Sequence, residues 1–344
     1  RAPDVNDIKN DILSILLGAE EQDIFDAPEN TVLVAKDLTP SMTARINKAN
    51  IAGIITETGG KTSHSAILAR AMEIPAVHSV PVVAEKLKNG ETVIVDGNDG
   101  IVIESPTQKQ IDEYTKLRTD FIEYRKALSK YIGRETKTVD GIKAELAVNI
   151  GKPDEANKAI ECDGEGIGLF RTEFLFMDRS TPPNEDEQFD AYKRVALIMK
   201  NKPVIIRTLD VGGDKGISYL KMPKEENPFL GFRAIRYCLK NEDMYKTQLR
   251  ALLRASAYGD IRIMLPFVTC VDEVRTVRKL IKEIMSDLSQ EGIAYKEDIK
   301  VGVMIETAAA CMIADILAKE SDFFSIGRND LTQYIMSVDR GNAD

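Results

Sequence analysis

The sequence is poor in the residues that carry imidazole and thiol chemistry. Among its 344 residues there is no tryptophan, and only two histidines occur, His64 and His78. Any reaction that needs an imidazole must therefore use one of these two. The four cysteines are scattered and form no Cys-x-x-Cys pair, which argues against a zinc site and fits a reducing, cytoplasmic location.

Two further absences exclude classes of partner. No apolar run approaches the ~20 residues of a membrane span, and no signal peptide is visible at the N-terminus. Basic residues are in the minority, with 46 Lys and Arg against 55 Asp and Glu, so the net charge is -9. Neither nucleic acid nor an anionic membrane surface is therefore expected as a general partner, although a local arginine cluster would allow an anionic substrate. At ~150 residues per domain, the length predicts about two domains.

Residues 1–105 contain short β-branched runs separated by Gly, Asn and Asp turns. Helical segments lie between these runs, so we expect a compact α/β domain built on a sheet. The predicted strands are Thr31–Ala35, Gly53–Thr56, Ala76–Val77, Thr92–Val95 and Ile101–Ile103.

Residues 106–138 form a charged segment in which apolar residues recur every three or four positions. A single apolar stripe of this kind predicts an amphipathic helix. The stripe consists of Ile111, Tyr114, Leu117, Phe121, Tyr124, Leu128 and Tyr131. Two interpretations stay open, a linker helix between two sheet-containing regions and an ordinary packing helix.

From residue 139 to residue 344 the pattern repeats as strand, loop and helix, which predicts a parallel sheet with covered faces. An incomplete (β/α)8 barrel, with its last two units missing, fits six such units better than a short open sheet does. The predicted strands are Ala144–Asn149, Gly166–Phe170, Val204–Thr208, Ile261–Val268, Val301–Glu306 and Phe323–Ile326. The helices predicted between them include Glu185–Met199, Lys246–Ala257 and Val271–Gln290.

The segment from Gly59 to Arg70 is the sharpest local signal. A glycine pair allows a tight turn, Thr62 or Ser63 is a suitable N-cap, and a helix follows. His64 would lie in the first helical turn, where free N–H groups favour an anion such as a phosphoryl group, and Arg70 could add positive charge. The alternative is a capped helix whose histidine only faces solvent. A P-loop is excluded, because the position five residues before Gly60 is not glycine.

Charged and amide side chains follow several of the later predicted strands. Active sites of (β/α)8 barrels lie at the carboxyl ends of the strands, so these side chains are expected to converge. The residues are Arg171, Arg207, Glu306, Asn329 and Asp330, together with Arg233, which lies in a loop expected to enter a helix. Two carboxylates, Glu306 and Asp330, suit Mg2+, and several arginines suit a substrate that carries phosphate and carboxylate. For any one arginine, a surface ion pair is the competing interpretation.

At this point the motifs resemble enzyme I of the bacterial phosphoenolpyruvate-dependent sugar phosphotransferase system. The similarity extends across nearly the whole chain. It rests on the His64 segment, Gly166–Asp178, Val204–Lys215, Asn227–Arg236, Val301–Glu306 and Phe323–Asn342.

The resemblance implies a phosphoenolpyruvate–protein phosphotransferase in which a swivelling phosphohistidine domain is joined by a long helix to the barrel. It assigns His64 as the phosphorylated (tele-phosphohistidine) residue, with Arg70 close by. It assigns substrate binding to Arg171, Arg207, Arg233, Asn329 and Arg340, and Mg2+ binding to Glu306 and Asp330. Phosphoenolpyruvate is the implied substrate, the small carrier protein HPr the implied acceptor, and a homodimer the usual state.

Several departures qualify the resemblance. The chain looks like an incomplete piece of a larger enzyme, since the HPr-binding domain and the barrel units that carry a catalytic cysteine are expected outside it. Arg328 and Ala308 replace the usual Thr and Pro, and His78-Ser79 replaces Val-Gly, so His78 is expected to be incidental. The alternatives are a module that binds phosphoenolpyruvate and Mg2+ without transfer, a nitrogen-related enzyme I paralogue, and the ATP-dependent dikinases, whose ATP-binding domain has no counterpart here.

Overall fold

The structure is a computed structural model that describes residues 27–38, 42, 46–60, 63–177, 179–213, 217–220 and 222–339. The chain divides into two compact units, residues 1–130 and 131–344. None of the helices in the described part combines the length and the apolar character that a bilayer crossing requires.

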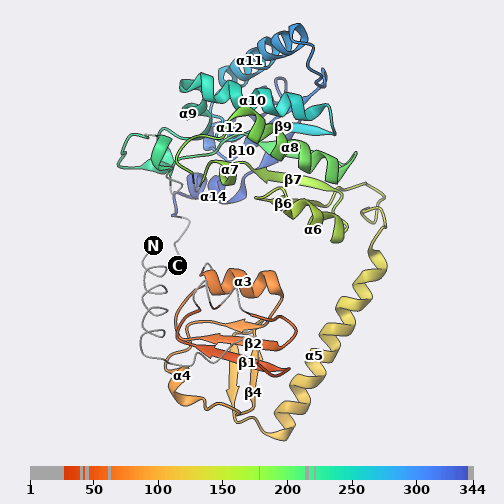
Figure 1. Cartoon of the computed structure of the whole chain (residues 1–344), viewed down its shortest axis with the longest axis vertical. Helices are drawn as coiled ribbons and strands as arrows, with labels where there is room; N and C mark the ends of the chain where they lie inside the picture. The colour runs from red at the N-terminus through yellow and green to blue at the C-terminus, as the bar shows by residue number, and fades with distance from the viewer. Residues whose placement is uncertain are drawn as a thin grey trace. The chain divides into compact units, whose positions relative to one another are not determined.

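The first unit contains a three-stranded parallel sheet and an antiparallel hairpin (Figure 1). Its elements are β1 (Thr31–Ala35), β2 (Ile51–Thr56), α3 (His64–Met72), β3 (Ala76–Val77), α4 (Val83–Lys86), β4 (Val93–Asp96) and β5 (Ile101–Glu104). The sheet order is β1-β2-β3, and β4 pairs with β5. The five predicted strands are therefore present, because β-branched runs between turn residues mark strands clearly.

Helix α3 lies on one face of this sheet, and β4 lies on the other (Figure 1). Ile54 in β2 and Ala69 in α3 are completely buried between the layers, together with Ile51 and Ile74. On the opposite face Gly53 lies so close to Val95 that an added Cβ would meet its side chain at 3.2 Å. The sheet therefore fixes where β2 ends and α3 begins.

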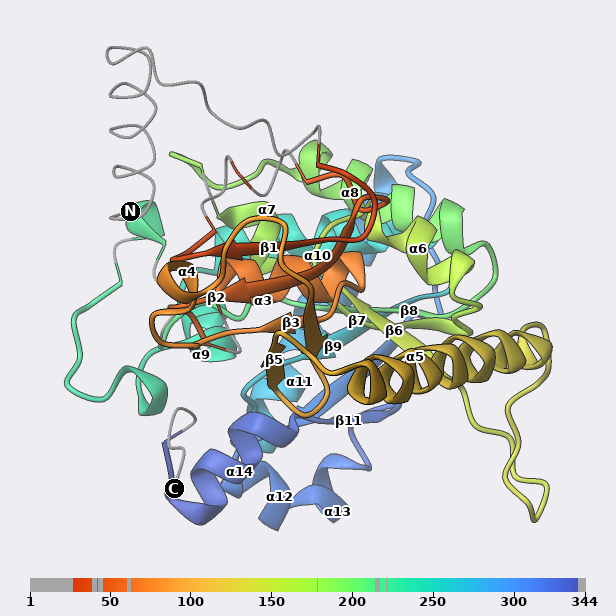
Figure 2. The same ribbon diagram turned by 90° about the horizontal axis from the view of Figure 1, so that it is seen from below.

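Helix α5 spans Gln108–Leu128 and continues into a 3-10 turn at Ser129–Tyr131; its ribbon is unbroken in Figure 2. It begins with a capping box, in which Thr107 and Gln110 bond to each other's backbone N–H. No residue of α5 is buried. Arg125 makes two hydrogen bonds of 2.8 and 3.0 Å to Glu73, so an exposed ion pair connects the helix to the end of α3 in the same unit.

The second unit is built on a parallel six-stranded sheet. Its strands are β6 (Ala147–Ile150), β7 (Gly166–Arg171), β8 (Val204–Arg207), β9 (Ile261–Leu265), β10 (Lys300–Ile305) and β11 (Phe324–Ile326). They pair in chain order from β6 to β11, and every pairing is parallel. This singly wound order is that of a (β/α)8 barrel, of which the described sheet holds six strands. The α/β class and the barrel-like topology agree with the sequence-based prediction.

Helices follow each of these strands. They are α6 (Glu155–Glu161), α7 (Glu173–Phe176), α8 (Glu185–Met199), α9 (Ala234–Lys240), α10 (Glu242–Ser256), α11 (Val271–Gln290), α12 (Ala308–Met312), α13 (Ala314–Leu317) and α14 (Arg328–Met336). Short 3-10 turns lie at Ser218–Leu220 and Pro228–Leu230. Helix α10 packs between α8 and α11 (Figure 1). The predicted bounds of α8 and α11 match the structure, because both helices are long and strongly periodic.

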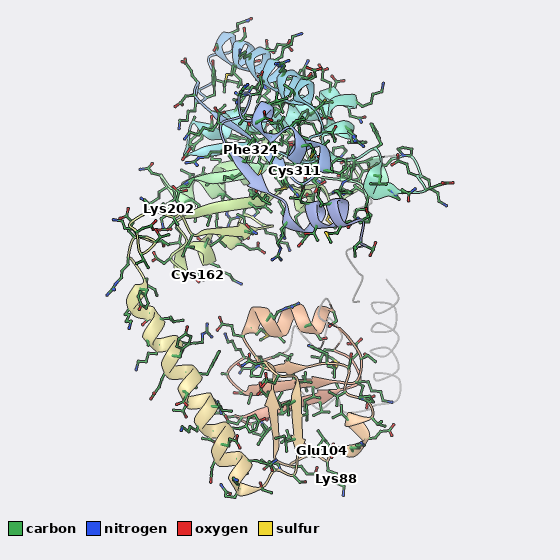
Figure 3. The ribbon with its side chains drawn as sticks, turned by 180° about the vertical axis from the view of Figure 1, so that it is seen from behind. Lys88, Glu104, Cys162, Lys202, Cys311 and Phe324 are labelled. Carbon is green, nitrogen blue, oxygen red and sulfur yellow. The ribbon has the colours of Figure 1, made fainter. Side chains whose placement is uncertain are left out.

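The core of the second unit lies between the sheet and the helices. Phe170 in β7 and Tyr192 in α8 are fully buried and meet edge to face, with ring centroids 6.0 Å apart. Cys238 is buried in this core, whereas Cys162 and Cys311 are exposed and lie apart in Figure 3. All four cysteines are free thiols, as their scattered spacing predicts. Packing in this core fixes the positions of the strands. It therefore also fixes the positions of the side chains that follow their carboxyl ends.

Candidate active site

Arg207 is the last residue of β8 and lies at the centre of a buried cluster of charges. Its Nη1 is 2.9 Å from Oδ2 of Asp210, and its Nη2 pairs with Glu173 at the start of α7. Thr172, next to Glu173, donates a hydrogen bond of 2.9 Å to the Arg207 carbonyl. The turn after β7 and the end of β8 are thereby joined. Burial alone would lower the pKa of Arg207, but Asp210 and Glu173 outweigh it and raise the pKa, so the guanidinium stays charged.

Arg233, the residue before α9, extends the cluster. Its Nη2 lies 2.9 Å from Oδ1 of Asp210 and 3.6 Å from Oδ2 of Asp330. Asp210 therefore contacts two arginines, one with each oxygen. The close packing requires glycine at Gly212, whose φ is 117° and where an added Cβ would lie 2.4 Å from Cβ of Arg233.

Three aromatic residues surround the Arg233 guanidinium. Its carbon lies 5.7 Å from the ring centre of Phe229 and 4.8 Å from that of Phe267, within range for cation–π attraction. Tyr334 of α14 accepts a long hydrogen bond from Arg233 Nη1, 3.4 Å, and donates one of 2.5 Å to the Phe229 carbonyl. Helix α14 is thus connected to the loop before α9.

Glu306 follows β10 and is almost completely buried. Its Oε1 accepts a hydrogen bond of 2.6 Å from the backbone N–H of Phe267. Gly327 lies against it, because an added Cβ there would be 2.6 Å from Glu306 Oε2. Burial raises the pKa of Glu306 to about 7; Asp210 and Asp330 add to the rise, and Arg207 opposes it.

The cluster holds four buried carboxylates, those of Glu173, Asp210, Glu306 and Asp330. Asp210 and Asp330 both help to raise the pKa of Glu306, so negative charge is crowded at this carboxylate. A divalent cation beside Glu306 and Asp330 would offset this crowding, so these residues fit Mg2+, which is usually held by one or two carboxylates plus water and phosphate oxygens. Among the residues that the structure describes, no three acidic, histidine or cysteine side chains group closely enough to hold a metal without such additional oxygens.

Two buried guanidinium N–H groups of the cluster do not donate a hydrogen bond to any described residue. The Nε atoms of Arg207 and Arg233 are buried and have no hydrogen-bond partner within the described residues. Buried donors without partners are costly, which makes them suitable for oxygens of a bound anion.

The structure brings four of the predicted site residues together, Arg207, Arg233, Glu306 and Asp330. Arg171 ends β7 directly beside Arg207 in the strand register, and its side chain is exposed. Asn329 precedes Asp330 in α14 and is exposed. Arg340 lies outside the described residues.

His64 and Arg70 belong to the first unit. His64 is the first residue of α3, and Ser63 is its N-cap, with its side chain accepting a hydrogen bond from Ala66 N–H. The predicted capped helix start is confirmed. Arg70 lies in the last turn of α3 and is exposed.

Three residues of the cluster were not predicted to take part, namely Glu173, Asp210 and Tyr334. Asp210 follows Arg207 by three residues, a spacing that allows a local ion pair after a strand. Tyr334 lies one helical turn after Asp330, on the same side of α14. Glu173 contacts Arg207 only because β7 and β8 are neighbours, which no local pattern reveals.

Comparisons with known proteins agree with this arrangement. Residues 125–344 match the family described as PEP-utilising enzyme, PEP-binding domain, and residues 27–100 match PEP-utilising enzyme, mobile domain. The chain belongs to the PEP-utilising enzyme family. Its PEP-binding domain contains the charge cluster, and its mobile domain contains His64.

Curated relatives carry the name phosphoenolpyruvate-protein phosphotransferase. The protein of Priestia megaterium is 49% identical over 342 residues, which cover 99% of this chain and 60% of that protein. The protein of Geobacillus stearothermophilus is 50% identical over 342 residues and is covered to 59%. The protein of Staphylococcus aureus (strain MSSA476) is 47% identical over 340 residues, also covered to 59%. The chain thus spans about three fifths of the length of these relatives.

Proposed function

We propose that this chain takes the phosphoryl group of phosphoenolpyruvate onto His64, as a phosphoenolpyruvate–protein phosphotransferase. The buried cluster of Arg207, Arg233, Glu306 and Asp330 carries this proposal, because it joins anion-binding groups to a pair of carboxylates suited to Mg2+. The names of the curated relatives support the same reaction.

The arginines would bind the substrate's two anionic ends. The unpartnered Nε atoms of Arg207 and Arg233 are donors for phosphate or carboxylate oxygens, and the surrounding carboxylates hold both guanidinium groups in place. Arg171, Asn329 and Arg340 complete the proposed substrate-binding set. Fixed donors of this kind stabilise charge without reorganising during the reaction.

Glu306 and Asp330 would hold the Mg2+ ion. When bound, Mg2+ neutralises charge on the phosphoryl oxygens as the phosphoryl group leaves. Glu306 is held against Phe267 N–H and Gly327, so its carboxylate is oriented before any ion binds. Transfer then requires the phosphorus atom and the His64 imidazole to come within bonding distance.

His64 suits the acceptor role because it opens α3. The first turn of a helix offers free N–H groups to an anion, which stabilises a phosphoryl group on the imidazole. Arg70 of the same helix would add positive charge. In the complete phosphotransferase system we propose that the group passes from His64 to the carrier protein HPr for sugar uptake, and that the working enzyme is a homodimer.

Intact-mass measurement tests the proposal. The chain is incubated with phosphoenolpyruvate and Mg2+, and its mass is read at neutral pH beside that of His64→Ala. A single acid-labile phosphoryl adduct, absent from His64→Ala and from a sample without Mg2+, is the expected result. If a folded sample binds phosphoenolpyruvate with Mg2+ but gains no adduct, the chain is a binding module and not a phosphotransferase.

A further inference from the structure

His78, the other histidine, is bonded to the strand that leads to His64. It follows β3, and its Nδ1 lies 2.8 Å from Oγ1 of Thr56, the last residue of β2. Thr56 is completely buried. The Thr56 hydroxyl also donates a hydrogen bond of 2.7 Å to the carbonyl of Thr58.

These two contacts determine which nitrogen of His78 carries the proton. A hydroxyl has one hydrogen, and a carbonyl oxygen can only accept. The Thr56 hydroxyl therefore donates its hydrogen to the Thr58 carbonyl oxygen. Toward His78, the Thr56 oxygen must therefore act as acceptor. Nδ1 of His78 must then carry the hydrogen, and in the neutral ring Nε2 is left without one.

Ser79 makes a second bond to the same segment. Its Oγ donates a hydrogen bond of 2.5 Å to the carbonyl of Gly59, and the next residue's N–H, of Val80, bonds to the Thr56 carbonyl at 3.0 Å. Ser79 has φ 61°, a left-handed conformation that favours glycine. Both side-chain bonds depend on these two residues, one on the ring nitrogen of His78 and the other on the hydroxyl of Ser79.

The segment that these bonds hold, residues 56–59, precedes α3 in the chain. On its other side, Thr58 N–H bonds to the carbonyl of Lys36 at 3.0 Å. Gly59, with φ 99°, lies so close to Ser63 that an added Cβ would be 3.1 Å from the Ser63 hydroxyl. Since Ser63 caps α3, the position of the Gly59 carbonyl affects the start of the helix that begins with His64.

We propose that His78 and Ser79 are positioning residues that hold the loop before His64, with His78 in its Nδ1–H form. The proposal rests on the proposed role of His64 as phosphoryl acceptor. His78 acts through Thr56, and Ser79 acts through Gly59.

The charges around His78 are consistent with a contact that persists across neutral pH. Burial lowers the pKa of His78, Arg70 of α3 lowers it further, and Asp37 after β1 opposes the change. The ring is therefore largely neutral above its lowered pKa. Nδ1 carries a hydrogen in both the neutral form described here and the cation, so the bond to Thr56 is expected in both forms.

Nitrogen-15 NMR of the imidazole tests the tautomer. In His64→Ala, His78 is the only histidine of the chain, so its ring signals need no further assignment. At a pH above the titration we expect Nδ1 to have the chemical shift of a protonated nitrogen and Nε2 that of an unprotonated one. The opposite pattern would overturn the proposal, whatever the enzyme does.

Two substitutions test the positioning role in the full chain. His78→Asn places an N–H donor near the position of Nδ1, whereas His78→Gln places its amide near the position of Nε2. We expect His78→Gln to speed amide hydrogen exchange at the hydrogen-bonded amides of Thr58, Ser63 and Ala66 in this loop by about ten-fold, and His78→Asn to leave it within about two-fold of the wild type. The same order is expected for the rate of His64 phosphorylation by phosphoenolpyruvate, with a loss of about ten-fold in His78→Gln.

The two readouts separate this inference from the proposed function. If the wild type gains no phosphoryl group, the proposed function fails, and hydrogen exchange still decides whether His78 holds the loop. If His78→Gln and His78→Asn exchange equally in this loop, the positioning role is wrong.

Discussion

Arg233 Nη2 lies 2.9 Å from Asp210 Oδ1, and both side chains are almost completely buried. Because Asp210 also pairs with Arg207, one carboxylate compensates two buried guanidinium groups. Such a group is costly to remove, since the partners stay buried with less compensation.

Asp210→Asn is therefore expected to lower the free energy of unfolding by about 3 kcal/mol, measured by urea denaturation. Asp260→Asn is the matched control. Asp260 pairs with Arg262 near the surface, where an ion pair contributes at most about 1 kcal/mol. Equal effects of the two substitutions would contradict the buried-cluster interpretation.

Magnesium binding should depend on Glu306 and Asp330. We expect Mg2+ to raise the melting temperature of the wild type, and Glu306→Gln or Asp330→Asn to abolish most of that rise, because each removes one of the two carboxylates. Glu297→Gln, which alters an exposed glutamate of the same unit, should respond to Mg2+ as the wild type does. Differential scanning calorimetry with and without Mg2+ is the measurement.

The raised pKa of Glu306 predicts a pH dependence of stability. Its pKa is about 7 in the folded chain against 4.5 for an ordinary glutamate, so the folded state binds more protons between these values. The free energy of unfolding should then fall as pH rises from 4.5 to about 7 in metal-free buffer, by at most about 3 kcal/mol.

Glu306→Gln isolates this contribution from those of other groups, because the amide does not titrate. As pH rises across that window, the unfolding free energy of the wild type should fall relative to that of Glu306→Gln. A difference that stays constant with pH would show that Glu306 has an ordinary pKa.

Tyr334 is expected to contribute to substrate binding through Arg233. Tyr334→Phe removes the hydroxyl that donates to the Phe229 carbonyl and accepts from Arg233, at a cost of about 1 kcal/mol in stability. We also expect weaker binding of phosphoenolpyruvate, measured by calorimetric titration with Mg2+ present. Tyr258→Phe, at a surface tyrosine, is the control for both measurements.

Much of the fold could be predicted from the sequence, because its signals are local. Periodicity located α8 and α11 to the residue. Strand ends were less predictable where distant groups compete for the backbone. The strand predicted from Ala144 begins only at Ala147, because the Leu146 N–H bonds to Glu165 and the Ala144 N–H bonds to Thr136.

The strand predicted to extend to Val268 ends at Leu265. Phe267 adopts a φ of 59°, which breaks the strand and turns its N–H toward Glu306. This departure belongs to the candidate site itself, where backbone conformation serves a polar contact.

The candidate site was also predictable in part, because some of its residues directly follow predicted strands. Polar residues after strands marked Arg207, Glu306 and Asp330, because the barrel topology gathers strand ends. Glu173 could not be assigned in this way, since its contact with Arg207 depends on packing between the neighbouring strands β7 and β8. Asp210 follows Arg207 in the chain, but its second contact depends on Arg233, which lies far from it in the sequence.

The strictly sequential order of the second sheet also has a consequence for local opening. Within the part of the chain that the structure describes, each strand of this sheet pairs with its neighbours in chain order, so β8 and β9 are flanked on both sides, whereas the three-residue β11 pairs with β10 alone. Backbone amides should therefore exchange most slowly at the centre and fastest near β11, as the sheet frays from its edges. Arg207 lies in a central strand and Asp330 follows the short edge strand β11, so we expect the proposed metal ligand to open locally more often than the anion-binding arginine does.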